Sequence, residues 1–398
     1  MERLIFHIDV NSAFLSWTSV KRLRNGESDL RLVPAVIGGD AQTRSGIVLA
    51  KSIPAKQFGI ETAEPLSMAL RKCPTLAIVP PEFTWYRQCS KAFKDICREY
   101  APVVEEYSID EVFLDMTGTG KIYPDPIKTA YEIKDRIRDT LGFTVNVGIG
   151  PNKLLAKMAG DFEKPDKVHT LFTDEIPAKM WPLPVRDLLY CGRSTSEHLN
   201  TGGIYTIGDL AGTDLTTLKK LMGDKAGEAL HRSANGIDES VVSDVYGDAK
   251  SYSIATTEDE DITSFARADE ILLELVDTVS KRLRSDEMYT TCIAVTVRYL
   301  DFKTRSHQRR LEDATNISRE IYETGRRLLR ELWDGHTPLR LLGIALNDVT
   351  KDDNSQLSLF EDNNQQREKH QLMDRTMDSI LNRFGKGSLK RGSSIKKQ

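Results

Sequence analysis

Three carboxylates occupy positions from which they could hold metal ions. Asp9 lies near the end of the apolar stretch Leu4 to Val10, and Asp110 and Glu111 are adjacent in a segment whose apolar and polar residues otherwise alternate. Hard cations such as Mg²⁺ take oxygen ligands, and two ions about 4 Å apart can clamp the attacking and leaving oxygens of phosphoryl transfer. Most Asp-Glu pairs are simply solvated, so the elements that position these acids decide what the acids can do.

The elements around the acids are predicted from apolar spacing. The β-branched run Leu4 to Val10 indicates a buried strand with Asp9 near its end, and residues 103–115 indicate a hairpin with the acid pair near its turn. The same patterns predict helices over 12–24, 84–100, 127–141 and 152–159, and strands over 33–37, 46–50 and 144–149. Strands 33–37 and 46–50 form a small subdomain. The remaining elements, joined to the first strand, give a β-α-β-β-α-β order, which is typical of an α+β layer with helices on one face of a sheet.

The chain changes character after residue 183. From there to residue 237 we expect short helices broken by glycines, whose N-terminal N–H groups suit phosphate oxygens, with a plain helical bundle as the alternative. Residues 237–250 indicate a linker. A second β-α-β-β-α-β set follows, with strands over 251–256, 291–299, 304–311 and 339–348, and helices over 265–285 and 317–333.

The two middle strands of this second set carry a basic cluster. Against a single acid, Asp301, they hold five cations, which are Arg298, Lys303, Arg305, Arg309 and Arg310. Because side chains alternate along a strand, we expect several of the five to project from one face and to meet nucleic-acid phosphates.

The overall composition narrows the class of protein. The chain has 398 residues, with 55 Lys and Arg against 59 Asp and Glu and a formal net charge of -4. Chains of this length usually form more than one domain, and no apolar run approaches the roughly 18 residues that cross a bilayer. The N-terminus does not read as a secretory signal, so we expect a cytoplasmic protein without a membrane partner. The five scattered cysteines favour buried thiols over disulfides or a zinc site.

Three segments together resemble a known enzyme family. The stretches HIDVNSAF at 7–14, YSIDEVFLD at 107–115 and VGIGPNKLLAKMAGDFEKPD at 147–166 are similar to the three motifs of the Y-family translesion DNA polymerases, most of all the bacterial DinB, or DNA polymerase IV, type. The resemblance extends over about residues 1–350. It implies an α+β multidomain right hand, with a palm over 1–12 and 82–171, fingers over 13–81, a helix-hairpin-helix thumb over 172–237 and a little finger over 250–350.

The resemblance also implies roles for individual residues. The metal ligands it implies are the carboxylates of Asp9, Asp110 and Glu111 and the carbonyl of Val10, which would hold two Mg²⁺ ions. Phe14 matches the aromatic steric gate that blocks a ribose 2′-OH, although ordinary core packing would also explain a lone phenylalanine there. Lys56 and Lys164 match the residues that hold the incoming triphosphate, with each charge-assisted contact contributing roughly 1.5 to 3 kcal/mol.

The chain departs from the family pattern at four positions. Ile53 and Ala50 stand where the family usually has a tyrosine and a threonine that bind the triphosphate, so two hydroxyl donors are missing. Ala13 replaces the aromatic before the gate, and Cys191 replaces the first glycine of the thumb hairpin. These departures predict weaker nucleotide binding or an altered pocket in a working enzyme.

Beyond residue 350 the sequence predicts a tail, 351–398, with two features. The run Gln356-Leu357-Ser358-Leu359-Phe360 resembles the peptide with which bacterial polymerases bind the sliding β clamp, with Gln356, Leu357, Leu359 and Phe360 as its contacts. A separate amphipathic helix is expected after it, with Met373, Met377, Ile380, Leu381 and Phe384 on its apolar side.

Taken together, the sequence predicts a monomeric, template-directed DNA polymerase of low fidelity that copies past damaged bases. Its expected partners are primer-template DNA, dNTPs and the clamp. A primer 3′-hydroxyl would attack the α-phosphate of a dNTP, with one metal lowering the hydroxyl pKa and the other neutralising pyrophosphate. Two alternatives remain open at this stage. One is a non-catalytic module that holds DNA and the clamp, and the other is a nucleotide cyclase, whose palm-like sheet also carries paired acids.

Overall fold

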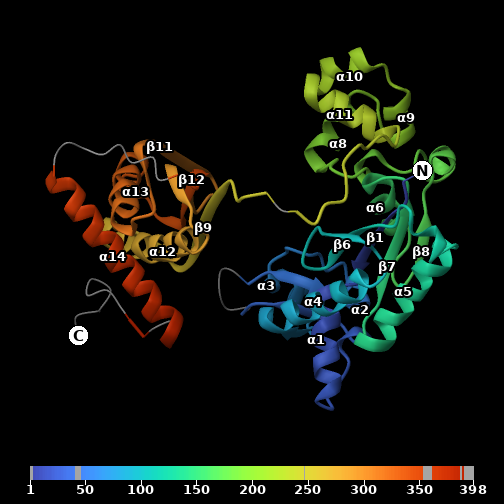
Figure 1. Ribbon diagram of the computed structural model, residues 1–398, viewed down its shortest axis with the longest axis horizontal. Helices are drawn as coiled ribbons and strands as arrows, with labels where there is room; N and C mark the ends of the chain where they lie inside the picture. The colour runs from blue at the N-terminus through green and yellow to red at the C-terminus, as the bar shows by residue number, and fades with distance from the viewer. Residues whose placement is uncertain (1–2, 41–45, 246, 353–360, 386–387, 390–398) are drawn as a thin grey trace. The chain divides into compact units, whose positions relative to one another are not determined.

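A computed structural model describes residues 3–40, 46–245, 247–352, 361–385 and 388–389 (Figure 1). The chain divides into two compact units, the first ending at residue 246 and the second beginning at residue 247. The five cysteines are buried free thiols, as the sequence predicts. Within the residues described, no helix is long and apolar enough to cross a membrane.

The first unit alternates short strands and helices. Its strands are β1 (Ile5–Val10), β2 (Ala35–Gly38), β3 (Val48–Lys51), β4 (Ala77–Val79), β5 (Val103–Glu106), β6 (Glu111–Asp115), β7 (Val145–Gly150) and β8 (Val168–Thr170). Its helices are α1 (Ala13–Arg24), α2 (Ile53–Gln57), α3 (Leu66–Lys72), α4 (Phe83–Arg98), α5 (Pro126–Leu141), α6 (Lys153–Asp161), α7 (Ile176–Lys179), α8 (Arg193–Thr201), α9 (Ile207–Gly212), α10 (Leu215–Met222) and α11 (Asp224–Ala234). Short 3₁₀ turns occur at Leu30–Leu32, Thr119–Lys121, Thr173–Glu175 and Val185–Asp187.

The second unit has a simpler order. It runs β9 (Ser251–Ile262), α12 (Phe265–Ser285), β10 (Tyr289–Tyr299), β11 (Thr304–Thr315), α13 (Ser318–Leu332), β12 (Leu339–Thr350) and α14 (Glu361–Phe384). The β-α-β-β-α-β set predicted here is confirmed, and the helix predicted over 265–285 has those bounds. The strands are longer than predicted, because polar stretches such as the end of β9 continue the pairing.

A five-stranded sheet with the order β5-β6-β1-β7-β8 forms the centre of the first unit. Strand β1 is central and pairs antiparallel with both β6 and β7. Its alternate residues Phe6, Ile8 and Val10 are buried in a core shared with α1, α4 and α5. The other set of alternate residues, which includes Asp9, therefore lies on the opposite face of the sheet.

The expectation of helices on one face of this sheet is wrong for α6. Val147 and Ile149 of β7 join the core on one face, whereas Gly148 lies against α6 on the other. A Cβ atom at Gly148 would stand 2.0 Å from the Ala156 carbonyl oxygen, so glycine is what lets the helix backbone approach the strand. The sheet is thus covered on both faces at β7.

Two smaller parts complete the first unit. A three-stranded sheet, β3-β2-β4, packs with α2 and α3 around Val36 and Leu66; the sequence pattern missed β4 and both short helices. The short helices predicted between residues 183 and 237 are present as α8 to α11. Gly227 of α11 lies so close to α10 that a Cβ there would be 2.8 Å from the Leu218 carbonyl oxygen, so these helices pack tightly together.

The second unit is a single sheet with the order β11-β10-β12-β9, in which all neighbours are antiparallel. Helices α12 and α13 pack on one face of it (Figure 1). The core between helices and sheet includes Leu272, Val276, Val295 and Leu342. This half of the fold therefore matches the one-faced α+β layer that the sequence predicts.

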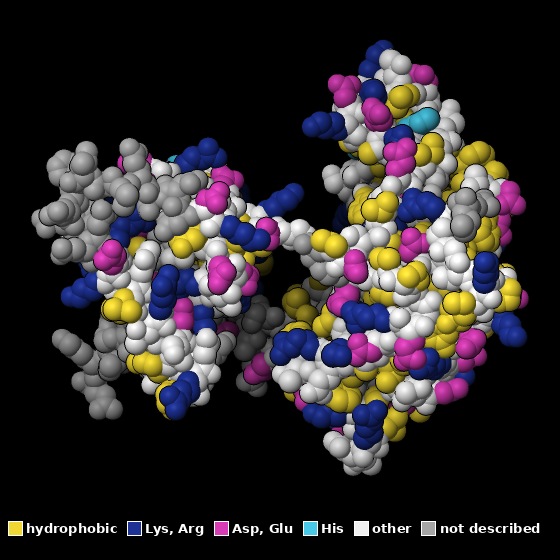
Figure 2. Space-filling model, viewed as in Figure 1, with side chains coloured by type: hydrophobic (Ala, Val, Ile, Leu, Met, Phe, Trp, Pro, Cys, Tyr) yellow, Lys and Arg dark blue, Asp and Glu magenta, His cyan; other side chains and the backbone are white. Residues whose placement is uncertain are grey.

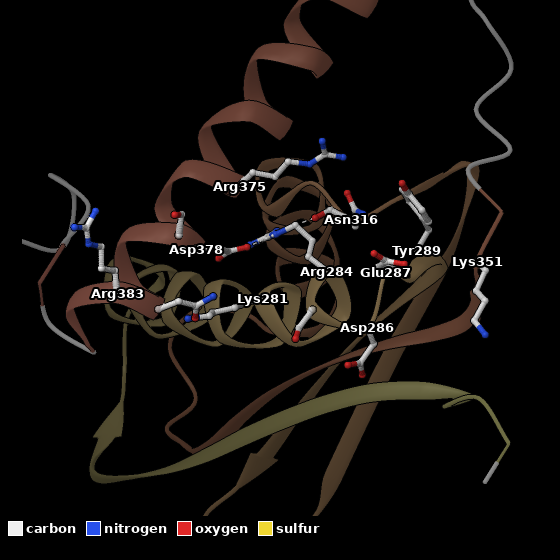
Figure 3. Close-up of a pocket in the computed structure, with 13 residues that line it drawn as sticks. Lys281, Arg284, Asp286, Glu287, Tyr289, Asn316, Lys351, Arg375, Asp378 and Arg383 are labelled. Atoms are coloured by element: carbon white, nitrogen blue, oxygen red, sulfur yellow. Dashed lines mark hydrogen bonds and ion pairs between the residues drawn. The ribbon is translucent and has the colours of Figure 1, made fainter. Parts of the chain in front are cut away.

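Helix α14 is attached to the second unit through polar contacts, so it is not the separate helix that the sequence predicts. Figure 3 shows Arg284 of α12 reaching Asp378 of α14, with an Nε to Oδ2 distance of 2.7 Å. The Ser318 backbone N–H donates to Asp374 Oδ2 at 2.8 Å, so α14 caps the first turn of α13. Arg284 also contacts Asp374 at 3.4 Å, which ties α12, α13 and α14 together.

The predicted apolar side of α14 is only partly covered. Met377, Ile380 and Leu381 are half-buried, whereas Met373 and Phe384 remain exposed. The amphipathic pattern thus identified the helix but not the ion pairs that hold it. The predicted clamp peptide, 356–360, lies outside the described residues.

Candidate active site

The three acids predicted to bind metal lie at one end of the β1–β6 strand pair. Asp9 and Glu111 are directly opposite each other in the antiparallel register, so their side chains share the face of the sheet away from the main core. Asp110 occupies the turn before β6, and its carbonyl accepts a hydrogen bond from the Val10 N–H at 3.0 Å. The strand end and the hairpin turn are therefore held side by side.

Each of the two facing acids is neutralised by a lysine. Lys164 forms an ion pair with Asp9, and Lys157 forms one with Glu111. The buried His7 also contacts Glu111, with 3.1 Å between Nε2 and Oε2. Within the described residues, no three Asp, Glu, His or Cys side chains converge as a ready-made metal site. The oxygen donors suit a hard cation, which would have to replace the lysines as the charge partner.

The environment shifts the pKa values of both carboxyls. Burial raises the pKa of Asp9, although the charge of Lys164 opposes the shift. Burial also acts to raise the pKa of Glu111, but hydrogen bonds from His7 and Lys157 outweigh it and lower that pKa to about 2. Glu111 is therefore ionised at neutral pH. Burial acts to lower the pKa of Lys164, but the Asp9 charge outweighs it and raises that pKa.

A cavity of about 310 Å³ opens beside the acids. Its lining residues are Asp9, Val10, Ser12, Ala13, Phe14, Leu49, Ala50, Lys51, Thr62 and Asp110. Four residues predicted for the site, Asp9, Val10, Phe14 and Asp110, thus share one cavity. Glu111 and Lys164 do not line this cavity. Glu111 lies opposite Asp9 on the neighbouring strand, and Lys164 forms an ion pair with Asp9. Lys56 is exposed on α2 and also lies outside the lining.

Phe14 stands at the wall of this cavity on an aromatic support. Its ring stacks on Tyr86 with 4.7 Å between centroids and an interplanar angle of 10°. Phe83 meets the same ring edge-on at 6.0 Å. Phe14 is half-buried, so it is both a packed residue and a cavity wall, and the two readings of this position are compatible.

The structure adds cavity residues that sequence reasoning missed. Lys51 and Thr62 line the same space as Ala50, one of the two positions that lack the family hydroxyl. Ile53, the other such position, is 55% exposed on α2. Lys51 follows Ala50 directly, so its charge was visible in the sequence. Its place in the lining was not, because that depends on the fold of β3.

A buried amide network fixes the segment that carries Lys164. Asn146, fully buried in β7, donates to the carbonyls of Gly160 at 3.0 Å and Glu163 at 2.7 Å. Its side-chain Oδ1 accepts a hydrogen bond from Asn11 Nδ2 at 3.0 Å, and Asn11 lies two residues after Asp9. The strand that ends at Asp9 and the loop before Lys164 are therefore tied to each other. Asn11 belongs to the motif at 7–14 but was assigned no role there, and Asn146 lies just outside the motif at 147–166.

The basic cluster of the second unit does not form one face. Arg305 and Arg309 pair with Val297 and Ile293, which are buried under the helices, so these two arginines lie on the helix side. Arg309 accordingly forms an ion pair with Glu331 of α13 at 2.7 Å. The expectation of a shared face is therefore wrong for this pair.

Two other arginines of the cluster lie on the sheet face opposite the helices. Arg298 pairs with Thr304 and Arg310 with Cys292, in the alternate register positions. Arg310 forms an ion pair with Asp348 at 2.8 Å, and Lys303 forms one with Asp301 in the turn. Figure 2 shows Lys and Arg side chains interspersed with Asp and Glu over the visible surface, in keeping with the balanced composition.

The chain is similar to known proteins along its whole length. Residues 8–161 match the impB/mucB/samB family, residues 249–359 match the C-terminal domain of that family, and residues 187–238 match a thumb domain described as that of DNA polymerase-iota. A protein of Clostridium acetobutylicum named DNA polymerase IV is 42% identical over 399 residues, which is 100% of both chains. The chain belongs to the Y-family DNA polymerases.

Further similarities agree with this membership. DNA polymerase IV 2 of Bacillus subtilis is 37% identical over 402 residues, covering 99% of this chain and 95% of that protein. A solved Y-family DNA polymerase chimera is 22% identical and aligns with a TM-score of 0.74, covering 88% of this chain and 100% of the chimera. That likeness shows the fold. The sequence prediction of a multidomain α+β DNA-directed DNA polymerase of the DNA polymerase IV type is confirmed.

Proposed function

We propose that this Y-family polymerase performs low-fidelity synthesis past damaged bases by metal-dependent nucleotidyl transfer at the end of the β1–β6 strand pair. The observation that carries the proposal is the cavity that Asp9, Asp110 and Phe14 line together, with Glu111 opposite Asp9. An acid cluster beside a space walled by an aromatic ring suits a nucleoside triphosphate, whose phosphates need cations and whose sugar needs a fitted wall.

Asp9, Asp110 and Glu111, with the Val10 carbonyl, are the proposed ligands of two Mg²⁺ ions. Metal bound there would supply the positive charge that favours loss of the primer 3′-hydroxyl proton and stabilises the phosphate oxygens. Lys164 and Lys157 occupy the carboxylates now. Lys164 also pairs with Asp161 at 2.8 Å. Once Asp9 has another charge partner, the donors of Lys164 that Asp161 does not use are available to the triphosphate, and Lys56 is the second cation that we assign to it.

Phe14 is the proposed sugar gate. Tyr86 and Phe83 support its ring from two sides, so the ring cannot easily turn away from the cavity. A rigid wall at this position would exclude the extra hydroxyl of a ribonucleotide by steric contact. Ala50 and Ile53 offer no hydroxyl to the phosphates, so we expect nucleotide affinity to depend more on lysines than the family pattern implies.

The proposed domains follow the right hand of the family. Residues 1–12 and 82–171 are assigned as palm, 13–81 as fingers, 172–237 as thumb and 250–350 as little finger. Backbone N–H groups of the short thumb helices and the arginines on the helix-free face of the β9–β12 sheet are the proposed contacts of primer-template DNA. Gln356 to Phe360 are the proposed clamp peptide, and the enzyme is proposed to act as a monomer.

Primer extension tests this function. The full chain, a primer-template with an undamaged or an abasic template position, and all four dNTPs are mixed with and without Mg²⁺. We expect Mg²⁺-dependent extension on both templates, with frequent misincorporation and no removal of mismatched primer ends. Extension that resists chelation would contradict the metal-dependent site, and extension that always stops at the damaged position would contradict the proposed bypass role.

A further inference from the structure

The turn that carries the proposed metal ligands is held from behind by helix α4. Lys94 Nζ donates to the Ser108 carbonyl oxygen at 2.8 Å. One helical turn earlier, Ser90 Oγ donates to the Ile109 carbonyl oxygen at 2.5 Å. These two carbonyls belong to the residues immediately before Asp110 and Glu111. Two side chains on one face of a helix thus fix two consecutive peptide groups.

Lys94 is an unusual residue for this place because it is charged and only 4% exposed. Its second contact explains how the charge is tolerated, since Nζ also donates to Glu106 Oε2 at 2.8 Å. Glu106 ends β5, on the other side of the same turn, and Arg98 of α4 binds its second oxygen at 2.5 Å. Burying a cation costs desolvation free energy that the anion and the carbonyl offset, so a change that removes one partner leaves a buried group without compensation.

Ile109 packs at the edge of the main core, but open space also lies between this turn and α4. A cavity of about 540 Å³ lies there, lined by Arg87, Ser90, Lys91, Lys94, Glu106, Ser108 and Ile109. The N–H groups of Tyr107 and Ser108 donate to the Glu111 carbonyl oxygen at 3.1 and 3.2 Å, which closes the turn, but the carbonyls of Ser108 and Ile109 are held by the two donors from α4. On the far side, the bond from Val10 N–H to Asp110 O holds only the end of the turn.

We propose that Lys94 and Ser90 are positioning residues of the metal centre, which set the angle at which Asp110 and Glu111 face Asp9. The inference rests on the proposed metal-binding role of those acids and goes beyond it, because neither α4 residue touches the cavity that Asp9 and Phe14 line. Residues that orient metal ligands through hydrogen bonds typically change metal affinity or activity about 10- to 100-fold when they are removed.

The test compares three variants of the full chain. Lys94→Met removes the buried donor and Ser90→Ala removes the hydroxyl. Lys91→Met is the matched control, since Lys91 lies on the same helix and lines the same cavity but pairs with the exposed Asp95. Single-turnover incorporation is measured against Mg²⁺ concentration, together with DNA affinity and the melting temperature of each variant.

We expect Lys94→Met to slow incorporation about tenfold or more at saturating DNA and to raise the Mg²⁺ concentration for half-maximal rate several-fold. Ser90→Ala should show the same shift to a smaller degree, and Lys94→Arg should restore part of the rate because it keeps a cationic donor. DNA affinity should stay within about twofold of the parent for all of them. The control should match the parent in rate and in Mg²⁺ dependence.

Lys94→Met could instead lower the melting temperature and leave both the Mg²⁺ midpoint and the rate per folded enzyme unchanged. That result would show that Lys94 has only a structural role and would overturn the inference. If Lys94→Met does not fold, Ser90→Ala decides the question by the same midpoint. Asp110→Asn separates the two levels of the argument. If that variant keeps full activity, the proposed metal site itself fails. If it is inactive while Lys94→Met and Ser90→Ala behave like the parent, only the positioning role fails.

Discussion

The strand pairs β1–β6 and β10–β11 both carry clustered charges, yet only the first brings them together. At β1–β6, Asp9 and Glu111 face each other across the register and Asp110 follows in the adjoining turn. At β10–β11, the register sends Arg305 and Arg309 to one face of the sheet and Arg298 and Arg310 to the other. The two regions have a similar density of charged residues in the sequence. Charge density alone therefore does not predict whether charged side chains come together in a site.

The difference lies in what fixes the face of each residue. In β1 the apolar Phe6, Ile8 and Val10 lie in the main core and alternate with the polar His7 and Asp9 on the other face, so the alternation of polar and apolar residues over 6–10 determines the face of the acid. In β11 the residues from Thr304 to Arg310 are all exposed, and no apolar alternation sets their parity. Their faces follow from β10, whose buried Val295 and Val297 lie opposite His307 and Arg305. A one-residue slip in such a strand would exchange every face.

The largest effect is predicted for substitutions of the acid pair, Asp110 and Glu111. Asp110→Asn and Glu111→Gln each remove a charge from the proposed metal site, and we expect incorporation to fall about a thousandfold or more, since charge stabilisation is the main catalytic contribution of such sites. DNA affinity should stay within about twofold. Single-turnover primer extension and equilibrium DNA binding measure the two quantities. Retention of more than a few percent of parental turnover would contradict the assignment.

Substitutions in the tail should change clamp binding without affecting the acids of β1–β6 or the arginines of β10–β11. Leu359→Ala with Phe360→Ala removes the proposed clamp anchors, and truncating a buried anchor typically costs about 2 kcal/mol, or roughly thirtyfold in affinity. Calorimetry with purified sliding clamp measures the loss. Distributive synthesis on short primers should be unchanged. Equal clamp affinity of the variant and the parent would exclude this peptide as the docking segment.

A substitution of Phe14 tests the shape of the cavity wall and leaves the charges of the site unchanged. Phe14→Val shortens a ring that stacks on Tyr86, so space opens beside the proposed sugar position. We expect the preference for dNTP over NTP to fall at least about tenfold, because loss of a steric clash is worth roughly 1 to 3 kcal/mol. Competition between dATP and ATP in single-nucleotide incorporation measures it. An unchanged preference would leave Phe14 as a core residue only.

The smallest effect is predicted for the arginines of β10 and β11, and it compares the two faces of that strand pair. Arg298→Ala with Arg310→Ala removes two cations from the helix-free face. We expect the salt dependence of DNA binding to weaken by about 0.9 per lost phosphate contact. The matched control is Arg305→Ala with Arg309→Ala on the helix side, which should leave the slope unchanged. A larger change in the control than in the test pair would reverse the assignment of faces.

The sequence predicted the parts of this molecule that depend on local pattern. The strand ending near Asp9, the hairpin turn at Asp110 and the helix over 265–285 all follow from apolar spacing that the final packing reinforces. It could not predict contacts between distant segments. Asn146 is an ordinary polar residue in the sequence, and only the fold shows that it joins Asn11 to the loop before Lys164.

The same limit explains two of the errors of arrangement, those of α6 and α14. Helix α6 covers the second face of the central sheet because Gly148 allows a close approach, which no periodicity reveals. Helix α14 joins the second unit through Asp374 and Asp378, residues that look like the solvated side of an amphipathic helix until Arg284 is placed beside them.

The most direct test of the central claim is a crystal structure of the full chain with primer-template DNA, a non-hydrolysable dNTP and Mn²⁺, in which anomalous scattering locates the metal. We predict Mn²⁺ in contact with Asp9, Asp110 and Glu111, with Lys164 moved from Asp9 to the triphosphate and Lys157 separated from Glu111. Mn²⁺ bound elsewhere, with both lysines still paired to their carboxylates beside the nucleotide, would contradict the account.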